Sequence, residues 1–226
     1  MEEWRQELER GFFTLGPAVE RLETAWAQYC GVKHAIGVNS GTDALIISMK
    51  ALGIGPGDEV LTCPNTFVAT VGAIVAVGAK PVFVDAGPDY LLDTEQASAA
   101  IDVKTRVIIP VDLTGRPAVH GWRGIEKSPY HVDVTPSGAK EPFYLPTIFI
   151  IRDACQSIGA TYNGTSSGCM ADLAAYSLHP LKNVHACGDG GMIVTDNDDW
   201  AAFARLYRNH GLKDRATVDM PVINSR

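Results

Sequence analysis

Lys182 is the residue of this sequence whose type and position most directly suggest covalent chemistry. It follows an apolar run that is typical of a buried strand, and Ser177 and His179 lie just before it. A lysine that is desolvated in such a place has a lowered pKa, which Schiff-base chemistry requires. The alternative for a single lysine is a solvated surface position. The segment therefore makes Lys182 a candidate nucleophile.

Asp153 is the second candidate, at the start of an Asp-Ala-Cys-Gln segment that ends with Gln156. It comes directly after an apolar run at residues 147–151 that predicts a buried strand. Open α/β sheets build their binding sites at the carboxyl ends of their strands. A carboxylate there could hold a proton on a ring nitrogen of a bound heterocycle. The alternative is that Asp153 is the N-cap of a following helix.

A third candidate is the turn Asn39-Ser40-Gly41-Thr42, which separates a short apolar strand from a helical pattern. The backbone N–H groups of Gly41 and Thr42 would point out of the helix start, where the helix dipole favours an anion. The Thr42 hydroxyl would be a third donor. The alternative is an ordinary N-cap made by Ser40 or Thr42. The sequence contains neither GxGxxG nor GxxxxGK[ST], so dinucleotide and P-loop sites find no support.

These segments belong to a regular alternation of apolar strands and amphipathic helices. Helices are predicted at residues 17–30, 42–52, 66–77, 94–101 and 198–207. Strands are predicted at residues 34–38, 59–63, 81–85, 106–111, 147–151, 173–177 and 192–195. Because the strands are wholly apolar, the alternation predicts a three-layer α/β/α fold around a mostly parallel sheet. Residues 118–146 have no clear period and predict an insertion or a lid.

Composition limits the classes of partner. Of the 226 residues 46% are hydrophobic and 20% charged, which is enough apolar material for a packed core. The net charge of −7 argues against nucleic acid or an anionic membrane as the main partner. The longest apolar stretch, residues 67–79, is too short to span a bilayer. The acidic N-terminal segment argues against a secretory signal. Five cysteines without a CxxC pair argue against a disulfide framework and a zinc site, and favour the cytoplasm.

A protein that binds pyridoxal 5′-phosphate (PLP) needs three groups: backbone donors for the phosphate, a carboxylate for the ring nitrogen and a reactive lysine. The three candidates above supply one of each. The sequence resembles the DegT/DnrJ/EryC1/StrS sugar aminotransferases, PLP-dependent enzymes with the type I, aspartate aminotransferase fold. The segments that carry the resemblance are residues 13–17, 29–35, 39–45, 51–60, 65–70, 81–85, 153–156, 177–182, 188–195, 208–211 and 224–226.

The resemblance implies catalytic and ring-binding roles for four residues. Lys182 would bind the cofactor covalently and act as general base and acid. Asp153 would keep the pyridinium nitrogen protonated, so that the ring serves as an electron sink. Gln156 would lie near the ring and its phenolic oxygen, and Phe67 would stack on the ring face. The resemblance implies no metal.

The resemblance also implies how the phosphate is held. Gly41, Thr42 and Ser177 would bind it from within the same chain. Asn224 would reach the phosphate in the neighbouring subunit's site, because members of the family are homodimers with shared active sites. Residues 1–226 would then form the PLP-binding large domain, without the small C-terminal domain that the family has.

The reaction implied is the transfer of an amino group, usually from glutamate, to a keto group of a nucleotide-linked deoxy-sugar. Some relatives use the cofactor for dehydration and have histidine in place of the lysine, so Lys182 favours transamination. One alternative is a truncated, catalytically inactive paralogue or fragment that still binds PLP. Another is a plain α/β binding domain, which would bind no PLP covalently.

Two residues depart from the pattern of the family. Asp112 stands where relatives usually have histidine, so the substrate contacts of the family are not carried over to this position. Arg152 stands where an acidic residue is common. Because side chains alternate along a strand, Arg152 is expected to point away from the cofactor and to have little effect.

Overall fold

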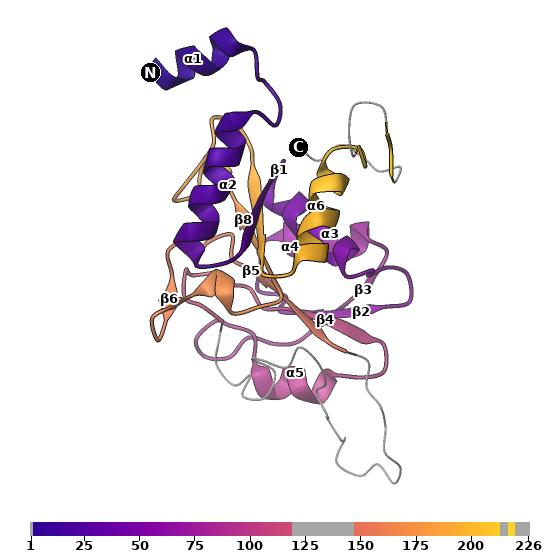
Figure 1. Ribbon diagram of the computed structural model, residues 1–226. Helices are drawn as coiled ribbons and strands as arrows, with labels where there is room; N and C mark the ends of the chain where they lie inside the picture. The colour runs from indigo at the N-terminus through magenta and orange to yellow at the C-terminus, as the bar shows by residue number, and fades with distance from the viewer. Residues whose placement is uncertain (1, 119–146, 213–216, 220–226) are drawn as a thin grey trace.

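A twisted sheet runs through the middle of the molecule, with helices on both of its faces (Figure 1). The computed structural model describes residues 2–118, 147–212 and 217–219. In that part of the chain the sheet has seven strands, in the spatial order β1 (His34–Val38), β9 (Gly191–Thr195), β8 (Leu173–Ser177), β5 (Phe149–Asp153), β4 (Thr105–Ile109), β2 (Glu59–Thr62) and β3 (Lys80–Phe83). The strands from β3 to β8 are parallel, and β9 runs antiparallel to both β8 and β1. The predicted mostly parallel sheet is thus confirmed.

The described chain has six α-helices, and all but the first form the two outer layers. They are α1 (Glu2–Arg10), α2 (Pro17–Cys30), α3 (Gly41–Ala51), α4 (Val68–Ala76), α5 (Thr94–Ala100) and α6 (Asp198–Arg208). Helices α3, α4 and α6 pack on one face of the sheet, and α2 and α5 pack on the other. Helix α1 projects beyond the body of the molecule (Figure 1). The three-layer α/β/α prediction is therefore confirmed.

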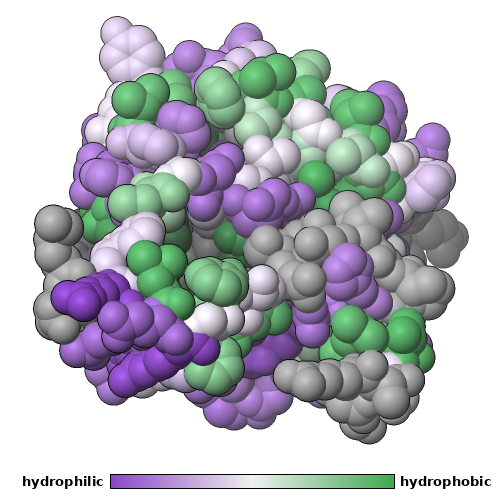
Figure 2. All heavy atoms as spheres, turned by 90° about the horizontal axis from the view of Figure 1, so that it is seen from above, coloured by the Kyte–Doolittle hydropathy of each residue, from purple (hydrophilic) through white to green (hydrophobic). Residues whose placement is uncertain are grey.

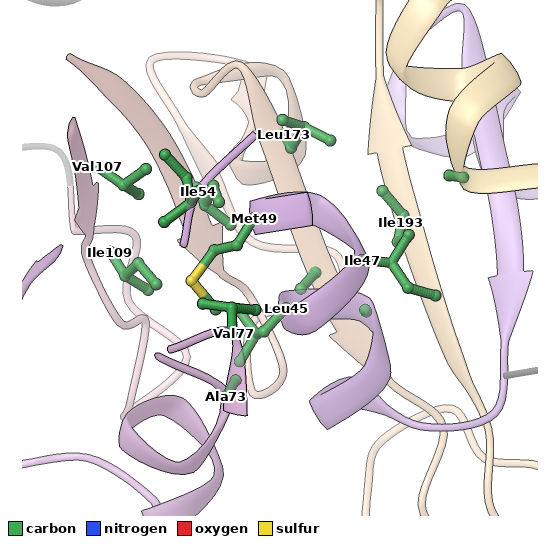
Figure 3. Close-up of a cluster of buried hydrophobic side chains, with 14 of the residues drawn as sticks. Leu45, Ile47, Met49, Ile54, Ala73, Val77, Val107, Ile109, Leu173 and Ile193 are labelled. Carbon is green, nitrogen blue, oxygen red and sulfur yellow. The ribbon is translucent and has the colours of Figure 1, made fainter. Parts of the chain in front are cut away.

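The core on the α3 side fixes the position of that helix over the sheet. Figure 3 shows Leu45 and Met49 of α3 among side chains of β4 and β8, including Ile109 and Leu173. All four are fully buried. Burial of one such side chain contributes roughly 1.5–3 kcal/mol, so a helix with several of them is held firmly. The start of α3 is consequently fixed at the carboxyl ends of the central strands.

The boundaries of some elements differ from the prediction. Strand β5 begins at Phe149 and ends at Asp153, two residues later than predicted, because its pairing with β8 continues to Asp153 and Ala175. Asp153 is therefore the last residue of the strand. Helix α4 begins at Val68, with Phe67 as its N-cap. Four elements were not predicted: α1, the two-stranded sheet of β6 (Thr161–Tyr162) and β7 (Thr165–Ser166), and the 3₁₀ helix Ser167–Cys169.

Two predictions concern residues that the structure does not describe. The predicted insertion or lid at residues 118–146 lies outside the described residues except for Ala118. Asn224 also lies outside them. Within the described ranges, no helix is both long and apolar enough to cross a bilayer. No cluster of histidine, cysteine and acidic residues there could hold a metal ion. On the face shown in Figure 2, hydrophobic and hydrophilic side chains are interspersed.

Candidate functional site

A cavity of about 520 Å³ opens where the parallel strands end, beside the start of α3. This volume is within the range of about 300–1,000 Å³ that is usual for small-molecule sites. Seven of the eight predicted site residues line it, and the eighth, Asn224, lies outside the described residues. The seven are Gly41, Thr42, Phe67, Asp153, Gln156, Ser177 and Lys182. The fold thus brings into one cavity residues that are up to 141 positions apart, from Gly41 to Lys182.

The N-terminus of α3 forms one side of the cavity. The Ser40 hydroxyl accepts a hydrogen bond from the Asp43 N–H at 3.0 Å, which is the ordinary N-cap that the sequence left open. Gly41 and Thr42, the first two residues of the helix, line the cavity directly after this cap. The partial positive charge of a helix N-terminus favours an anion. Capping and anion binding are therefore compatible at this turn.

Gly41 is required by how closely α3 approaches its neighbours. A Cβ atom there would lie 2.8 Å from Ser177 Cβ and 2.9 Å from Cys155 Sγ. Contacts this short are not tolerated, so any larger residue would push the helix away from the end of β8. The absence of a side chain at Gly41 allows Ser177 and the helix start to line the same part of the cavity.

Asp153 is held with both carboxylate oxygens engaged. Its Oδ2 atom accepts a hydrogen bond from Thr70 Oγ1 at 2.7 Å, and its Oδ1 atom accepts one from the Cys155 N–H at 3.2 Å. Thr70 is itself 2.7 Å from the hydroxyl of Thr66, which lines the cavity. No helix begins directly after Asp153, where β5 ends and the chain turns toward β6, so the N-cap alternative is wrong. A carboxylate fixed in this way can accept a further hydrogen bond from a protonated ring nitrogen.

Lys182 lies in the long connection between β8 and β9. It is half-buried, and its N–H donates to the His179 carbonyl at 2.8 Å, which closes a turn. Cys155 lies nearby in the cavity wall. Its burial raises the pKa of its thiol well above the ordinary value, and the charge of Asp153 raises it further. The charge of Lys182 lowers the pKa of the same thiol. Cys155 is therefore a neutral group in the cavity wall.

The structure adds two threonines that the sequence analysis missed. Thr66 and Thr70 are four residues apart, and in the helix predicted at residues 66–77 that spacing would place them on the same side. In the structure Thr66 precedes α4, and its hydroxyl still lies 2.7 Å from that of Thr70. That spacing, within a segment predicted as helical, was the available signal. Phe67 lies between them in sequence, lines the cavity and is 69% exposed.

Asp112 and Arg152, the two departures from the family pattern, meet in the structure. Arg152 Nη1 lies 2.9 Å from Asp112 Oδ1, and the two residues are 2% and 0% exposed. Arg152 points away from the cavity, as predicted. The side chain of Asp112 is buried and does not line the cavity, whose wall at this loop is formed by its neighbours Val111 and Leu113.

The sequence matches the family model of the DegT/DnrJ/EryC1/StrS aminotransferase family over residues 1–127 and 146–226. It is 42% identical over 215 residues to a pleiotropic regulatory protein of Geobacillus stearothermophilus, covering 95% of this chain and 54% of the relative. It is 37% identical over 220 residues to dTDP-3-amino-3,4,6-trideoxy-alpha-D-glucose transaminase of Streptomyces venezuelae, covering 97% of this chain and 54% of the relative. The chain thus spans about half the length of the curated relatives it matches.

Solved structures are also similar to this chain over about half of their own length. DesV of S. venezuelae superimposes with a TM-score of 0.86 at 37% identity, over 98% of this chain and 56% of DesV. NtdA of Bacillus subtilis, solved with bound cofactor PMP, superimposes with a TM-score of 0.79 at 33% identity, over 98% of this chain and 46% of NtdA. The fold around the cavity is therefore shared with proteins of known structure.

Proposed function

Because this chain belongs to the DegT/DnrJ/EryC1/StrS aminotransferase family, we propose that it acts in a PLP-dependent transfer of an amino group to a nucleotide-linked deoxy-sugar. Family membership agrees with the resemblance that the motifs indicated. The observation that carries the proposal is the cavity that combines a lysine, a fixed carboxylate and a helix N-terminus. The name of the Streptomyces venezuelae relative supports a sugar nucleotide as the substrate class.

The cavity fits the chemical groups of PLP. An anionic phosphate suits the start of α3, where Gly41 and Thr42 lie opposite Ser177. A protonated ring nitrogen suits Asp153, whose remaining hydrogen bonds come from neutral donors. We assign the ring face to Phe67 and the ring edge to Gln156. When bound, the cofactor supplies an electron sink that allows an amino group to be exchanged between two substrates.

Lys182 is the residue to which we assign covalent attachment and proton transfer. Its Nζ atom would hold the cofactor covalently, and the same amine would act as the general base and acid for the proton that moves during the exchange. The Asp153 carboxylate would accept a hydrogen bond from the protonated ring nitrogen and so stabilise the positive charge there. These two residues would be the catalytic pair.

We further propose that the amino donor is glutamate and that the protein works as a cytoplasmic homodimer with shared active sites. Phe67 and Leu181 line the cavity and are 69% and 87% exposed, so apolar surface surrounds its mouth. A second copy that covers this mouth would remove such surface from water. In the same arrangement Asn224 would serve the partner's phosphate site.

The amino-transfer step is tested by a half-reaction. The purified chain is loaded with PLP and mixed with glutamate, and the visible absorption of the bound cofactor is followed. The expected result is a loss of that absorption with release of 2-oxoglutarate, absent in Lys182→Ala and retained in the control Lys104→Ala. Stable PLP binding without 2-oxoglutarate would instead indicate an inactive PLP-binding paralogue or fragment.

Sharing of the site is tested by mixing two variants. Lys182→Ala and Asn224→Ala are each expected to lower activity strongly. If Asn224 serves the partner, a mixed dimer contains one site with both residues intact, so mixing should recover part of the activity. No recovery, with mixed dimers demonstrated by mass, would contradict a shared site.

A further inference from the structure

Two adjacent loops form the cavity wall at the ends of β4 and β5. The loop after β4 contributes Val111 and Leu113, and the end of β5 with its loop contributes Asp153, Cys155 and Gln156. The two loops come from parallel neighbouring strands, with Val111 paired to Asp153. A shift of one loop against the other would therefore displace the carboxylate and the amide that face the cavity.

The side chain of Asp112 connects these loops from behind the wall. Its carboxylate accepts hydrogen bonds from Arg152 Nη1 at 2.9 Å, from Ser157 Oγ at 2.6 Å and from the Ala118 N–H at 2.7 Å. Arg152 Nη2 also donates to the Met170 carbonyl at 3.4 Å. Asp112 thus binds its own loop through Ala118, strand β5 through Arg152 and the loop after β5 through Ser157.

The main chain links this network directly to Asp153. The Asp112 N–H donates to the Asp153 carbonyl at 3.0 Å, and the Asp153 N–H donates to the Pro110 carbonyl at 3.0 Å. Further along the loop, a Cβ atom on Gly115 would lie 3.2 Å from the Gln156 carbonyl oxygen. The loops are therefore in close contact next to both Asp153 and Gln156.

Burial makes this network costly to form. Desolvation raises the pKa of the Asp112 carboxyl, and Arg152, Ser157 and the Ala118 N–H act in the opposite direction. Buried ion pairs often stabilise a fold no better than apolar residues of similar volume would, whereas removing one partner alone is strongly destabilising. A network of this kind directly behind a binding site is better explained by the geometry that it imposes.

We propose that Arg152 and Asp112 are a positioning pair, which locks the loops after β4 and β5 together so that Asp153 and Gln156 face the cofactor. Both residues act from behind the cavity wall. The inference rests on the proposed function, since it concerns the same site.

Paired substitutions separate positioning from folding stability. Asp112→Asn and Arg152→Met each leave one buried charge without its partner, so each should lower stability. The double variant removes both charges and should recover much of that stability. The matched control is the double variant Glu23→Gln/Arg208→Met, which removes a second buried arginine–carboxylate pair of the described chain, neither residue of which lines the cavity.

Two measurements are made on the double variants. The first is hydrogen exchange of the amides at residues 112–118 and 154–160 in the cofactor-free chain. The second is PLP affinity, together with the pH dependence of the visible absorption of bound PLP. In the Asp112/Arg152 double variant we expect faster exchange in both loops, a shifted pH dependence, and affinity weakened by about tenfold, as for loss of one charge-assisted hydrogen bond. The control should match the unmodified chain.

An Asp112/Arg152 double variant that matches the unmodified chain in exchange and in PLP affinity would overturn the proposal. If that variant does not fold, Ser157→Ala provides the test, because it removes one donor to Asp112 without removing a charge. It should accelerate exchange in the same loops and weaken PLP binding, and no change in either would likewise overturn the proposal. An unmodified chain that binds no PLP would count against the proposed function, and the exchange data would still decide whether the pair holds the loops.

Discussion

Within the part of the chain that the structure describes, two arginine–carboxylate pairs are buried in different regions, one behind the cavity and one at the edge of the sheet. Arg152 and Asp112 lie behind the loops that end β4 and β5. Arg208 of α6 and Glu23 of α2 lie beside β1, the first strand in the sheet order. Both pairs are buried, and both include hydrogen bonds to the backbone. Burial and chemistry alone therefore do not distinguish them.

The pair at the edge is explained by the edge strand whose backbone it binds. Gly37 lies in β1, and its outward N–H donates to Glu23 Oε1 at 2.8 Å, while its carbonyl accepts from Arg208 Nη1 at 2.8 Å. An edge strand otherwise leaves such groups without partners. The Arg208–Glu23 pair thus completes the hydrogen bonding of the sheet edge and ties α2 and α6 to it. The comparison teaches that the function of a buried ion pair is determined by which backbone it holds.

The largest effect on stability is expected when the edge pair is broken. Arg208→Met leaves Glu23 buried without its cation and the Gly37 carbonyl without its donor. We expect a loss of about 3 to 5 kcal/mol in the free energy of unfolding, measured by urea denaturation. PLP affinity of the folded variant should be unchanged. Weakened PLP binding with folding intact would remove the distinction between the two regions.

A smaller loss of stability but a larger loss of binding is expected at the cavity. Gly41→Ala places a methyl group within 2.8 Å of Ser177 Cβ, and the strain of such overpacking is typically about 1–3 kcal/mol. PLP affinity should fall as well, because α3 moves away from Ser177. The control is Gly72→Ala in α4, where a Cβ atom meets nothing within 4 Å. Equal behaviour of the two variants in PLP titration would contradict the assignment of the phosphate site.

Two helix caps, one beside the cavity and one away from it, allow a comparison with smaller losses of stability. Ser40→Ala removes the cap of α3 beside the cavity, and Asp93→Ala removes the cap of α5, which accepts from the Glu95 and Gln96 N–H groups. Each should cost about 1 kcal/mol of stability in thermal or urea unfolding. Only Ser40→Ala should also weaken PLP binding, because it loosens the helix start that faces the phosphate. Weaker binding in Asp93→Ala would show a general rather than a local effect.

The smallest effect is expected for an exposed cluster near the edge pair. Hydrogen bonds from Lys33, then from His34, lower the pKa of the Asp198 carboxyl below its ordinary value of 3.8. Because the folded pKa is the lower one, the stabilisation is present above pH 3.8 and is lost as the pH falls below it. The stability difference between the unmodified chain and Asp198→Asn should therefore be small near neutral pH and vanish in acid. A difference that grows in acid would contradict this sign.

Most of the sheet and its helices could be predicted from the sequence because the residues that begin and end each element lie within or next to it. Helix α2 has its predicted bounds, since Pro17 suits a first turn and Gly31 takes the left-handed conformation that ends the helix. Strand β5 was placed two residues early because Arg152 and Asp153 are charged. Their burial depends on partners in other segments, which a local pattern does not reveal.

The β6–β7 hairpin was missed although a signal existed. Asn163 and Gly164 connect the two strands, and both have positive φ, 50° and 79°. An Asn-Gly pair is the strongest short-range indicator of a hairpin. The strands are only two residues long, so they lack the apolar alternation on which the prediction relied.

The residues of the candidate site could be predicted more completely than the contacts among them. Gly41, Asp153 and Ser177 lie where strands end or a helix begins, and a mostly parallel sheet brings such positions together. The contact between Arg152 and Asp112 joins residues 40 positions apart and depends on the register that pairs Val111 with Asp153. That register becomes visible only in the folded chain.

The most direct test of the central claim is to locate the covalent attachment of PLP. The chain is incubated with PLP, reduced with borohydride and digested, and the labelled peptide is identified by mass spectrometry. One modified residue, Lys182, is expected in the unmodified chain, and no modification is expected in Lys182→Ala. Stoichiometric labelling of another lysine, or a folded chain with no labelling at all, would contradict it.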